Sequence, residues 1–264
     1  MKLSIITVTR NNLAGLRRTA ESVAAQVWRD FEWIVIDGAS TDGTKEFLQQ
    51  LSPQPDWWKS EPDSGVYDAM NKGIAIAQGE YLLFLNAGDS LCNANTLQEC
   101  FHNFPKGDIV YGDAFFIFPK KKTQMIHPDR LDLYYFRRHS LCHQATFIRT
   151  SLLKGCGGYS TKYRIASDWR QWLVWTLEER TFTHLPILVC NYMMDGLSCT
   201  QESASTMERE EIYRELLPQP VYQLMVAEEE VYRNRRKKHV TTCYCLAIAN
   251  VVLILIILLL CLLR

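Results

Sequence analysis

The sequence predicts an α/β fold in which helices flank a mostly parallel sheet, followed by a C-terminal transmembrane helix. Apolar, strand-like runs alternate with helical patterns between residues 3 and 85, and polar turn residues separate them, which indicates the α/β part. An uncharged apolar stretch at the C-terminus indicates the membrane part. The chain has 264 residues, enough for one sizeable domain with an appendage.

The first strand–helix–strand unit is predicted over residues 3–37. Residues 3–9 and 33–36 form largely apolar runs without helix breakers, and the second run ends at Asp37, as is typical of buried parallel strands. Between them, after two asparagines at positions 11 and 12 that can cap a helix, apolar residues recur at helical spacing. These residues are Leu13, Leu16, Ala20, Val23, Ala24 and Val27.

The alternation continues along the chain. We expect helices over 44–51 and 65–78, strands over 80–85 and 108–118, and a helix and turn over 173–185 before the apolar strand PILVCNY. Ligands of parallel α/β sheets gather at the carboxyl ends of the strands. Asp37 and Asp89 fall at two such ends, so both are candidates for a binding site.

Three regions follow from this pattern: an α/β domain over 1–200, an amphipathic helical linker over 201–240 that Pro218 and Pro220 divide, and a transmembrane helix over 241–263. From Cys243 to Leu263 no residue is charged, and roughly 20 such residues span a bilayer. A buried core helix is the alternative, but such a helix would have a polar face.

The charges predict the topology and exclude one class of partner. A basic cluster directly before the apolar stretch is expected to stay cytoplasmic: Arg233, Arg235, Arg236, Lys237, Lys238 and His239. The protein is therefore expected in the cell inner membrane, single-pass, with its N-terminal α/β domain in the cytoplasm. The formal net charge is zero, which argues against nucleic acid as a partner.

Four segments resemble family 2 glycosyltransferases, which have the Rossmann-like GT-A fold: SIITVTRNN, FEWIVIDGASTDGT, SEPDSGVYDAMNKGIAIAQGEYLLFLNAGD and IASDW. The similarity covers roughly residues 2–195 and is nearest to bacterial exopolysaccharide and colanic-acid-type transferases. The resemblance implies a hexosyltransferase-like enzyme that moves a sugar from a nucleoside diphosphate to an acceptor hydroxyl, usually with inversion and a divalent metal.

Asp89 is the predicted metal ligand, for Mn²⁺ or Mg²⁺. A diphosphate leaving group gains negative charge as the glycosidic bond breaks, so a hard cation held by a carboxylate is the natural electrophile. Relatives carry two acidic residues in this turn, whereas Asn86 and Gly88 stand here, so one acidic ligand remains. Alternatively, Asp89 only caps the turn.

The resemblance also assigns a nucleotide-sugar site. Asp37 is expected to contact the nucleoside, Lys72 to offset phosphate charge, and His143 to touch the diphosphate or the acceptor. A lone histidine is otherwise a structural hydrogen-bonding residue. The predicted nucleotide-sugar residues are Val8, Thr9, Asn11, Asp37, Asp63, Asn71, Lys72, Asn86 and His143.

Asp168 is the predicted general base. An attacking hydroxyl must lose its proton, and a carboxylate near the anomeric carbon can take it. The segment YRIASDWRQWL resembles the family's later acidic motif at the start of a helix, where the helix dipole keeps a carboxylate ionised. The alternative is an ordinary first-turn aspartate.

The leading hypothesis is an inverting transferase in cell-surface polysaccharide biosynthesis, acting on a saccharide or polyprenyl-linked acceptor beside the membrane. A catalytically silent, membrane-anchored partner subunit of the same fold is the alternative, because the turn at residues 86–89 has one acidic residue where relatives have two. A nucleotidyltransferase would need a Gly-rich basic N-terminal loop, which residues 9–12 do not supply.

Overall fold

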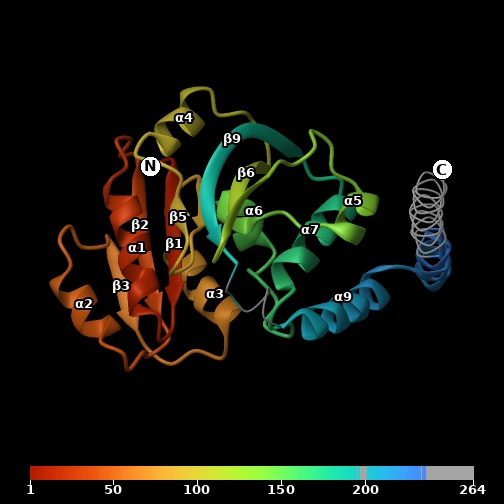
Figure 1. Ribbon diagram of the computed structural model, residues 1–264, viewed down its shortest axis with the longest axis horizontal. Helices are drawn as coiled ribbons and strands as arrows, with labels where there is room; N and C mark the ends of the chain where they lie inside the picture. The colour runs from red at the N-terminus through yellow and green to blue at the C-terminus, as the bar shows by residue number, and fades with distance from the viewer. Residues whose placement is uncertain (195, 197–200, 233, 236–264) are drawn as a thin grey trace, which may run out of the picture. The chain divides into compact units, whose positions relative to one another are not determined.

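The computed structural model describes residues 1–194, 196, 201–232 and 234–235 (Figure 1). The chain falls into two compact units, Met1–Arg209 and Glu210–Arg264. Every strand of the described residues belongs to the first unit, which therefore contains the whole sheet.

The predicted strand–helix–strand unit is confirmed. Strand β1 (Leu3–Thr9) pairs in parallel with β2 (Phe31–Asp37) along their full lengths, and α1 (Leu13–Ala24) connects them. The Asn12 side chain accepts a hydrogen bond from the Gly15 N–H and caps α1, as its position predicts. Both strands end at the same level of the sheet, so their last residues lie side by side.

The sheet is mixed, so the expectation of a mostly parallel sheet is wrong. Its order is β3-β2-β1-β4-β8-β6-β9-β5, with β7 paired to β6. The β6–β7 hairpin is antiparallel because a tight turn joins its strands, and β8 runs antiparallel to β4 and β6. The remaining strands are β3 (Trp57–Ser60), β4 (Tyr81–Phe84), β5 (Ser90–Leu91), β6 (Ile109–Phe118), β7 (Lys121–Met125), β8 (Thr146–Arg149) and β9 (Phe182–Met193).

One expected helix and the strand after it have different bounds. Helix α7 covers Ser167–Leu177 and β9 starts at Phe182, whereas the sequence predicted a helix and turn over 173–185. Pro186 lies inside β9 at an irregularity of its pairing with β6, where a missing N–H is tolerated. The other helices are α2 (Thr44–Gln50), α3 (Val66–Ile76), α4 (Thr96–His102), α5 (Leu133–Arg138), α6 (Thr150–Gly155) and the 3₁₀ helix η1 (His143–Ala145).

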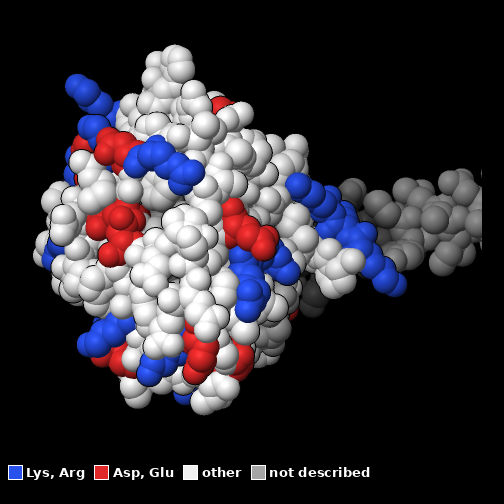
Figure 2. All heavy atoms as spheres, turned by 90° about the vertical axis from the view of Figure 1, so that its left-hand side faces the viewer, with Lys and Arg blue, Asp and Glu red and all other residues white. Residues whose placement is uncertain are grey.

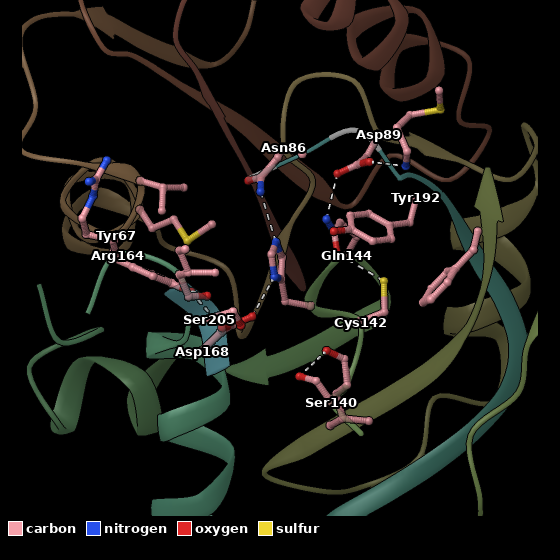
Figure 3. Close-up of a pocket in the computed structure, with 18 of the residues that line it drawn as sticks. Tyr67, Asn86, Asp89, Ser140, Cys142, Gln144, Arg164, Asp168, Tyr192 and Ser205 are labelled. Atoms are coloured by element: carbon pink, nitrogen blue, oxygen red, sulfur yellow. Dashed lines mark hydrogen bonds and ion pairs between the residues drawn. The ribbon is translucent and has the colours of Figure 1, made fainter. Parts of the chain in front are cut away.

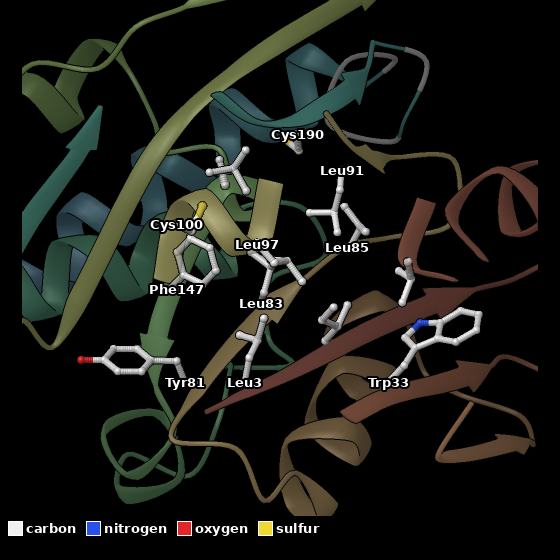
Figure 4. Close-up of a cluster of buried hydrophobic side chains, with 14 of the residues drawn as sticks. Leu3, Trp33, Tyr81, Leu83, Leu85, Leu91, Leu97, Cys100, Phe147 and Cys190 are labelled. Atoms are coloured by element: carbon white, nitrogen blue, oxygen red, sulfur yellow. The ribbon is translucent and has the colours of Figure 1, made fainter. Parts of the chain in front are cut away.

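Successive residues of β1 face opposite sides of the sheet, and each side has its own helices. Leu3 belongs to a buried cluster that includes side chains of α1, α2 and α4 (Figure 4). Ile6 points the other way, toward α3, where a Cβ on Gly73 would lie 2.6 Å from its Cγ2. Helices on both sides thus bury the strands whose carboxyl ends lead to the site.

The C-terminal part of the described chain is helical. Helix α9 covers Glu202–Leu216, and a second helix covers 219–232, so the chain breaks at Pro218 as predicted. Pro220 lies in the first turn of the second helix, where its missing N–H costs no hydrogen bond. Of the helices described, none is both long and apolar enough to cross a bilayer. The transmembrane segment predicted over 241–263 lies outside the described residues.

Candidate active site

A cavity of about 340 Å³ lies in the first unit beside the turn that follows β4 (Figure 3). Its walls come from α3, the turn 86–89, residues 140–144, residues 164–168 at the start of α7, the ends of β6, β7 and β9, and α9. Asp89 and Asp168 both line this cavity, together with Asn86 and His143. The structure therefore brings four of the predicted site residues together; Asp37 is not among the cavity's lining residues.

Asp168 lies in the first turn of α7, as predicted, with both carboxylate oxygens held. Oδ1 lies 2.8 Å from the Tyr67 hydroxyl and accepts a hydrogen bond from the Trp169 N–H, and Oδ2 lies 3.0 Å from Nδ1 of His143. Burial by itself raises the pKa of Asp168, but hydrogen bonds and charge from His143 and hydrogen bonds from Tyr67 and Trp169 outweigh it and lower that pKa. Asp168 is thus kept as a carboxylate.

His143 connects Asp168 to the turn after β4. Its Nε2 lies 3.1 Å from Nδ2 of Asn86, and its Nδ1 faces Asp168. An ionised carboxylate only accepts hydrogen bonds, so Nδ1 of His143 is the donor in the contact with Asp168. Oδ1 of Asn86 is buried and has no hydrogen-bond partner among the described residues. An unpaired buried oxygen beside a cavity is a candidate ligand contact.

Asp89 is only 5 % exposed and fastens two other segments to the turn. Its Oδ1 accepts a hydrogen bond from the Met193 N–H at the end of β9, and its Oδ2 accepts one from Nε2 of Gln144. Oε1 of Gln144 in turn accepts from the Cys142 thiol. The sequence did not single out Gln144; its position directly after His143 was the only available signal.

Asp37 has no solvent-exposed surface, and serines surround its carboxylate. It accepts hydrogen bonds from the hydroxyls of Ser40 and Ser60, and from the Ser40 N–H. The neighbouring Thr9 hydroxyl is buried without a hydrogen-bond partner among the described residues. The predicted nucleoside contacts therefore lie at the ends of β1 and β2, separate from the cavity lining.

Val8 and Asn11 hold loops near these strand ends. The Val8 carbonyl accepts a hydrogen bond from the Ala87 N–H, which attaches the turn after β4 to β1. Asn11 has a positive φ of 49°, and its Oδ1 accepts from the Thr41 N–H. The structure thus gives both residues a part in shaping the loops, and their predicted contact with a nucleotide stays a prediction.

Three residues predicted for the nucleotide side make contacts outside the cavity. Lys72 donates to the Pro62 carbonyl and lies 3.3 Å from Glu61, so its charge is already balanced by a carboxylate. Asp63 accepts from the Gly65 N–H. Asn71 uses both ends of its amide on the backbone of Tyr159: Nδ2 donates to the carbonyl, and Oδ1 accepts from the N–H.

Asn71→Ala is expected to lower the free energy of unfolding by about 1–3 kcal/mol, because it leaves polar backbone groups of Tyr159 without partners. Urea unfolding followed by circular dichroism measures this loss. Nucleotide affinity should change little, since the amide is engaged away from the cavity. A large loss of nucleotide affinity at unchanged stability would instead support the predicted nucleotide contact.

Two contributors to the site were not foreseen. Tyr67 is not among the predicted site residues, but its hydroxyl lies 2.8 Å from Oδ1 of Asp168 and 2.7 Å from the Ile165 carbonyl oxygen. Glu208 of α9 accepts hydrogen bonds from three consecutive N–H groups, those of residues 164–166, each at 2.9 Å. Glu208 thereby holds the segment that leads into α7, and in the sequence it is indistinguishable from the other glutamates around it.

Comparison with known proteins points to one family. The family model described as glycosyl transferase family 2 matches residues 4–161. A glycosyltransferase of PGL/p-HBAD biosynthesis from Mycobacterium bovis is 37 % identical over 196 residues, covering 72 % of this chain and 73 % of that protein. An uncharacterized glycosyltransferase of Mycobacterium tuberculosis is 36 % identical over 173 residues, covering 63 % of this chain and 65 % of that protein.

Solved structures share the fold at low sequence identity. TarS of S. aureus, in complex with UDP-GlcNAc, aligns with a TM-score of 0.65 and 18 % identity over 86 % of this chain and 71 % of that one. The mannosyltransferase PcManGT of Pyrobaculum calidifontis, in complex with GDP-Man and Mn²⁺, aligns with a TM-score of 0.63 and 18 % identity over 86 % of this chain and 68 % of that one. These alignments show a GT-A-like α/β fold.

Proposed function

Because the chain belongs to glycosyl transferase family 2, we propose that it transfers a sugar from a nucleoside-diphosphate sugar to an acceptor hydroxyl with inversion at the anomeric carbon. The family membership confirms the resemblance seen in the sequence. One observation carries the proposal: the carboxylate of Asp168 and the turn that bears Asp89 line the same cavity. A base and a diphosphate-binding turn must face each other across the sugar for an in-line displacement.

In the proposed reaction the acceptor oxygen attacks the anomeric carbon while the bond to the diphosphate oxygen breaks. Asp168 takes the hydroxyl proton, and the electron pair of the broken bond leaves with the diphosphate. The pKa of Asp168 lies below the ordinary aspartate value, so the group is ionised at neutral pH and has a lone pair free to accept a proton. A single displacement reverses the configuration of the anomeric carbon, which is why we propose inversion.

We propose that Asp89 holds a divalent cation, Mn²⁺ or Mg²⁺, together with the donor phosphates. When bound, such an ion would neutralise charge on the leaving diphosphate. Among the residues that the structure describes, no group of three or more His, Cys, Asp or Glu side chains could hold a metal by itself. One carboxylate plus substrate phosphates is nonetheless a common way to bind Mg²⁺, and the unpaired Asn86 oxygen adds a hard donor nearby.

The acceptor and the location are proposed from the C-terminal apolar stretch and the basic cluster before it. The uncharged stretch from Cys243 to Leu263, with the basic cluster before it, supports a single-pass protein of the inner membrane with a cytoplasmic catalytic domain. An anchored enzyme meets membrane-bound substrates, so we propose a saccharide or polyprenyl-linked acceptor in cell-surface polysaccharide biosynthesis. Release of the full chain from membranes by alkaline carbonate would contradict the anchor.

A catalytically silent partner subunit is the second candidate, favoured by Asn86 and Gly88 in the usually acidic turn. Calorimetry with UDP and GDP, each with and without Mn²⁺, separates the two. The enzyme is expected to bind one nucleotide more tightly with the metal. A folded chain that binds neither nucleotide would favour the silent subunit.

Activity itself is tested with a panel of nucleotide sugars and a membrane extract as acceptor, with mass spectrometry of the products. The expected result is one donor whose sugar mass is added to an extracted acceptor. Nucleotide binding without any such product, across the panel, would contradict a transferase acting on these acceptors.

A further inference from the structure

The 3₁₀ helix η1 supplies two consecutive side chains that reach the turn after β4. His143 reaches Asn86, and Gln144 reaches Asp89, at 3.1 Å and 2.8 Å respectively. Only His143 also contacts Asp168, on the opposite wall of the cavity (Figure 3). One imidazole ring therefore spans the gap between the donor-side turn and the predicted base.

The two carboxylate oxygens of Asp168 differ in how many hydrogen bonds hold them. Oδ1 is fixed twice, by the Tyr67 hydroxyl and by the Trp169 N–H. Oδ2 is held by Nδ1 of His143 alone among the contacts of the described residues. A carboxylate oxygen can accept about two hydrogen bonds, so Oδ2 keeps room for an acceptor hydroxyl while His143 orients it.

The placement of His143 differs from that of a core residue. Its side chain and that of Asp168 are 16 % and 15 % exposed, so both sit at the cavity surface and not in the packed interior. His127 and His184 also form side-chain hydrogen bonds, but neither residue lines the cavity. A ring at the surface of a cavity, bonded on both nitrogens, orients its neighbours more than it fills space.

We infer that His143 is a positioning residue, which fixes Oδ2 of Asp168 at a set separation from the Asn86 turn. The inference rests on the proposed function, because it gives the residue that aligns the base with the donor. Without the ring, Asp168 keeps its place through Oδ1, but Oδ2 loses the contact that directs it. The chemical step should then suffer more than donor binding, since small misplacements of a base are costly in rate.

Three substitutions of His143 separate this role from packing. His143→Ala is expected to lower kcat by about 10- to 100-fold and to change the donor KM by less than about threefold. His143→Asn places an amide N–H where Nδ1 stood and should recover kcat to within about fivefold of wild type. His143→Gln puts its amide farther out, near the position of Nε2, and should remain as slow as the alanine variant.

The exposed His102 of α4 provides the matched control, and His102→Ala should keep wild-type kcat and KM. Thermal unfolding of each variant accompanies the kinetics. The inference is overturned if His143→Ala keeps wild-type kcat, if asparagine fails to restore kcat in a folded protein, or if kcat falls only in step with stability. An inactive wild-type chain would instead refute the proposed function, so the two failures are distinguishable.

Discussion

Replacing Asp168 with asparagine is expected to lower kcat for sugar transfer by about 10²- to 10⁴-fold, the range that a general base contributes. The asparagine oxygen can still accept the hydrogen bonds that Tyr67 and Trp169 direct at Oδ1, so the start of α7 should keep its structure. Its Nδ2 takes the place of Oδ2 and cannot accept from Nδ1 of His143, so this one contact is lost. What it cannot do is take the acceptor proton. Initial rates at saturating donor and acceptor measure the effect, and calorimetry with UDP and GDP should show unchanged nucleotide binding.

Asp68→Asn is the matched control for this experiment. Asp68 also lies in the first turn of a helix, α3, and accepts a hydrogen bond from a backbone N–H, that of Ser64, but it does not line the cavity. Its variant should transfer sugar at the wild-type rate. If Asp168→Asn is as active as Asp68→Asn, Asp168 is not the base and the reaction must lose its proton elsewhere.

Asp89→Asn is expected to have two effects, because Asp89 faces the cavity and also joins two segments of the fold. Metal-dependent strengthening of donor binding should fall by at least about tenfold, since an amide oxygen is a weaker ligand than a carboxylate for a hard cation. The free energy of unfolding should also fall by about 1–3 kcal/mol, because hydrogen bonds from Gln144 and Met193 lose a charged acceptor. Calorimetry with and without Mn²⁺ and urea unfolding measure these separately.

Asp113→Asn distinguishes the two effects. Asp113 is as buried as Asp89 and accepts a hydrogen bond from the His127 N–H, but it lies on β6 outside the cavity lining. The Asp113→Asn variant should have a lower free energy of unfolding and keep the wild-type metal dependence of donor binding. Unchanged metal dependence in Asp89→Asn would show that the cation, if used, is held by other groups.

Local sequence patterns were sufficient for the N-terminal strand–helix–strand unit, although they did not predict β3 beside it. The largely apolar run 3–9, the capped helix after it and the run ending at Asp37 each depend on neighbours along the chain, and the structure has all three. The strands of the second half could not be ordered in this way. That β8 lies between β4 and β6, antiparallel to both, is decided by pairing between distant segments, and the parallel expectation was wrong there.

The same limit applies to the site. Asp89 and Asp168 were found because short motifs around them resemble those of the family, and both line the cavity. Asn71 and Lys72 belong to an equally recognisable motif, yet their side chains contact Tyr159 and Glu61. A motif places a residue on a helix, but the partners of its side chain depend on which segments the fold packs against that helix.

By itself, the sequence determined the family, the N-terminal strand–helix–strand unit and the identity of two cavity carboxylates, because each is written in contiguous residues. Only the tertiary structure decided how these carboxylates are held. Asp168 and Tyr67 are 101 positions apart, Asn86 and His143 are 57 apart, and Asp89 and Gln144 are 55 apart. Hydrogen bonds over such separations form only after the sheet has brought the strand ends together, so no local pattern could reveal them.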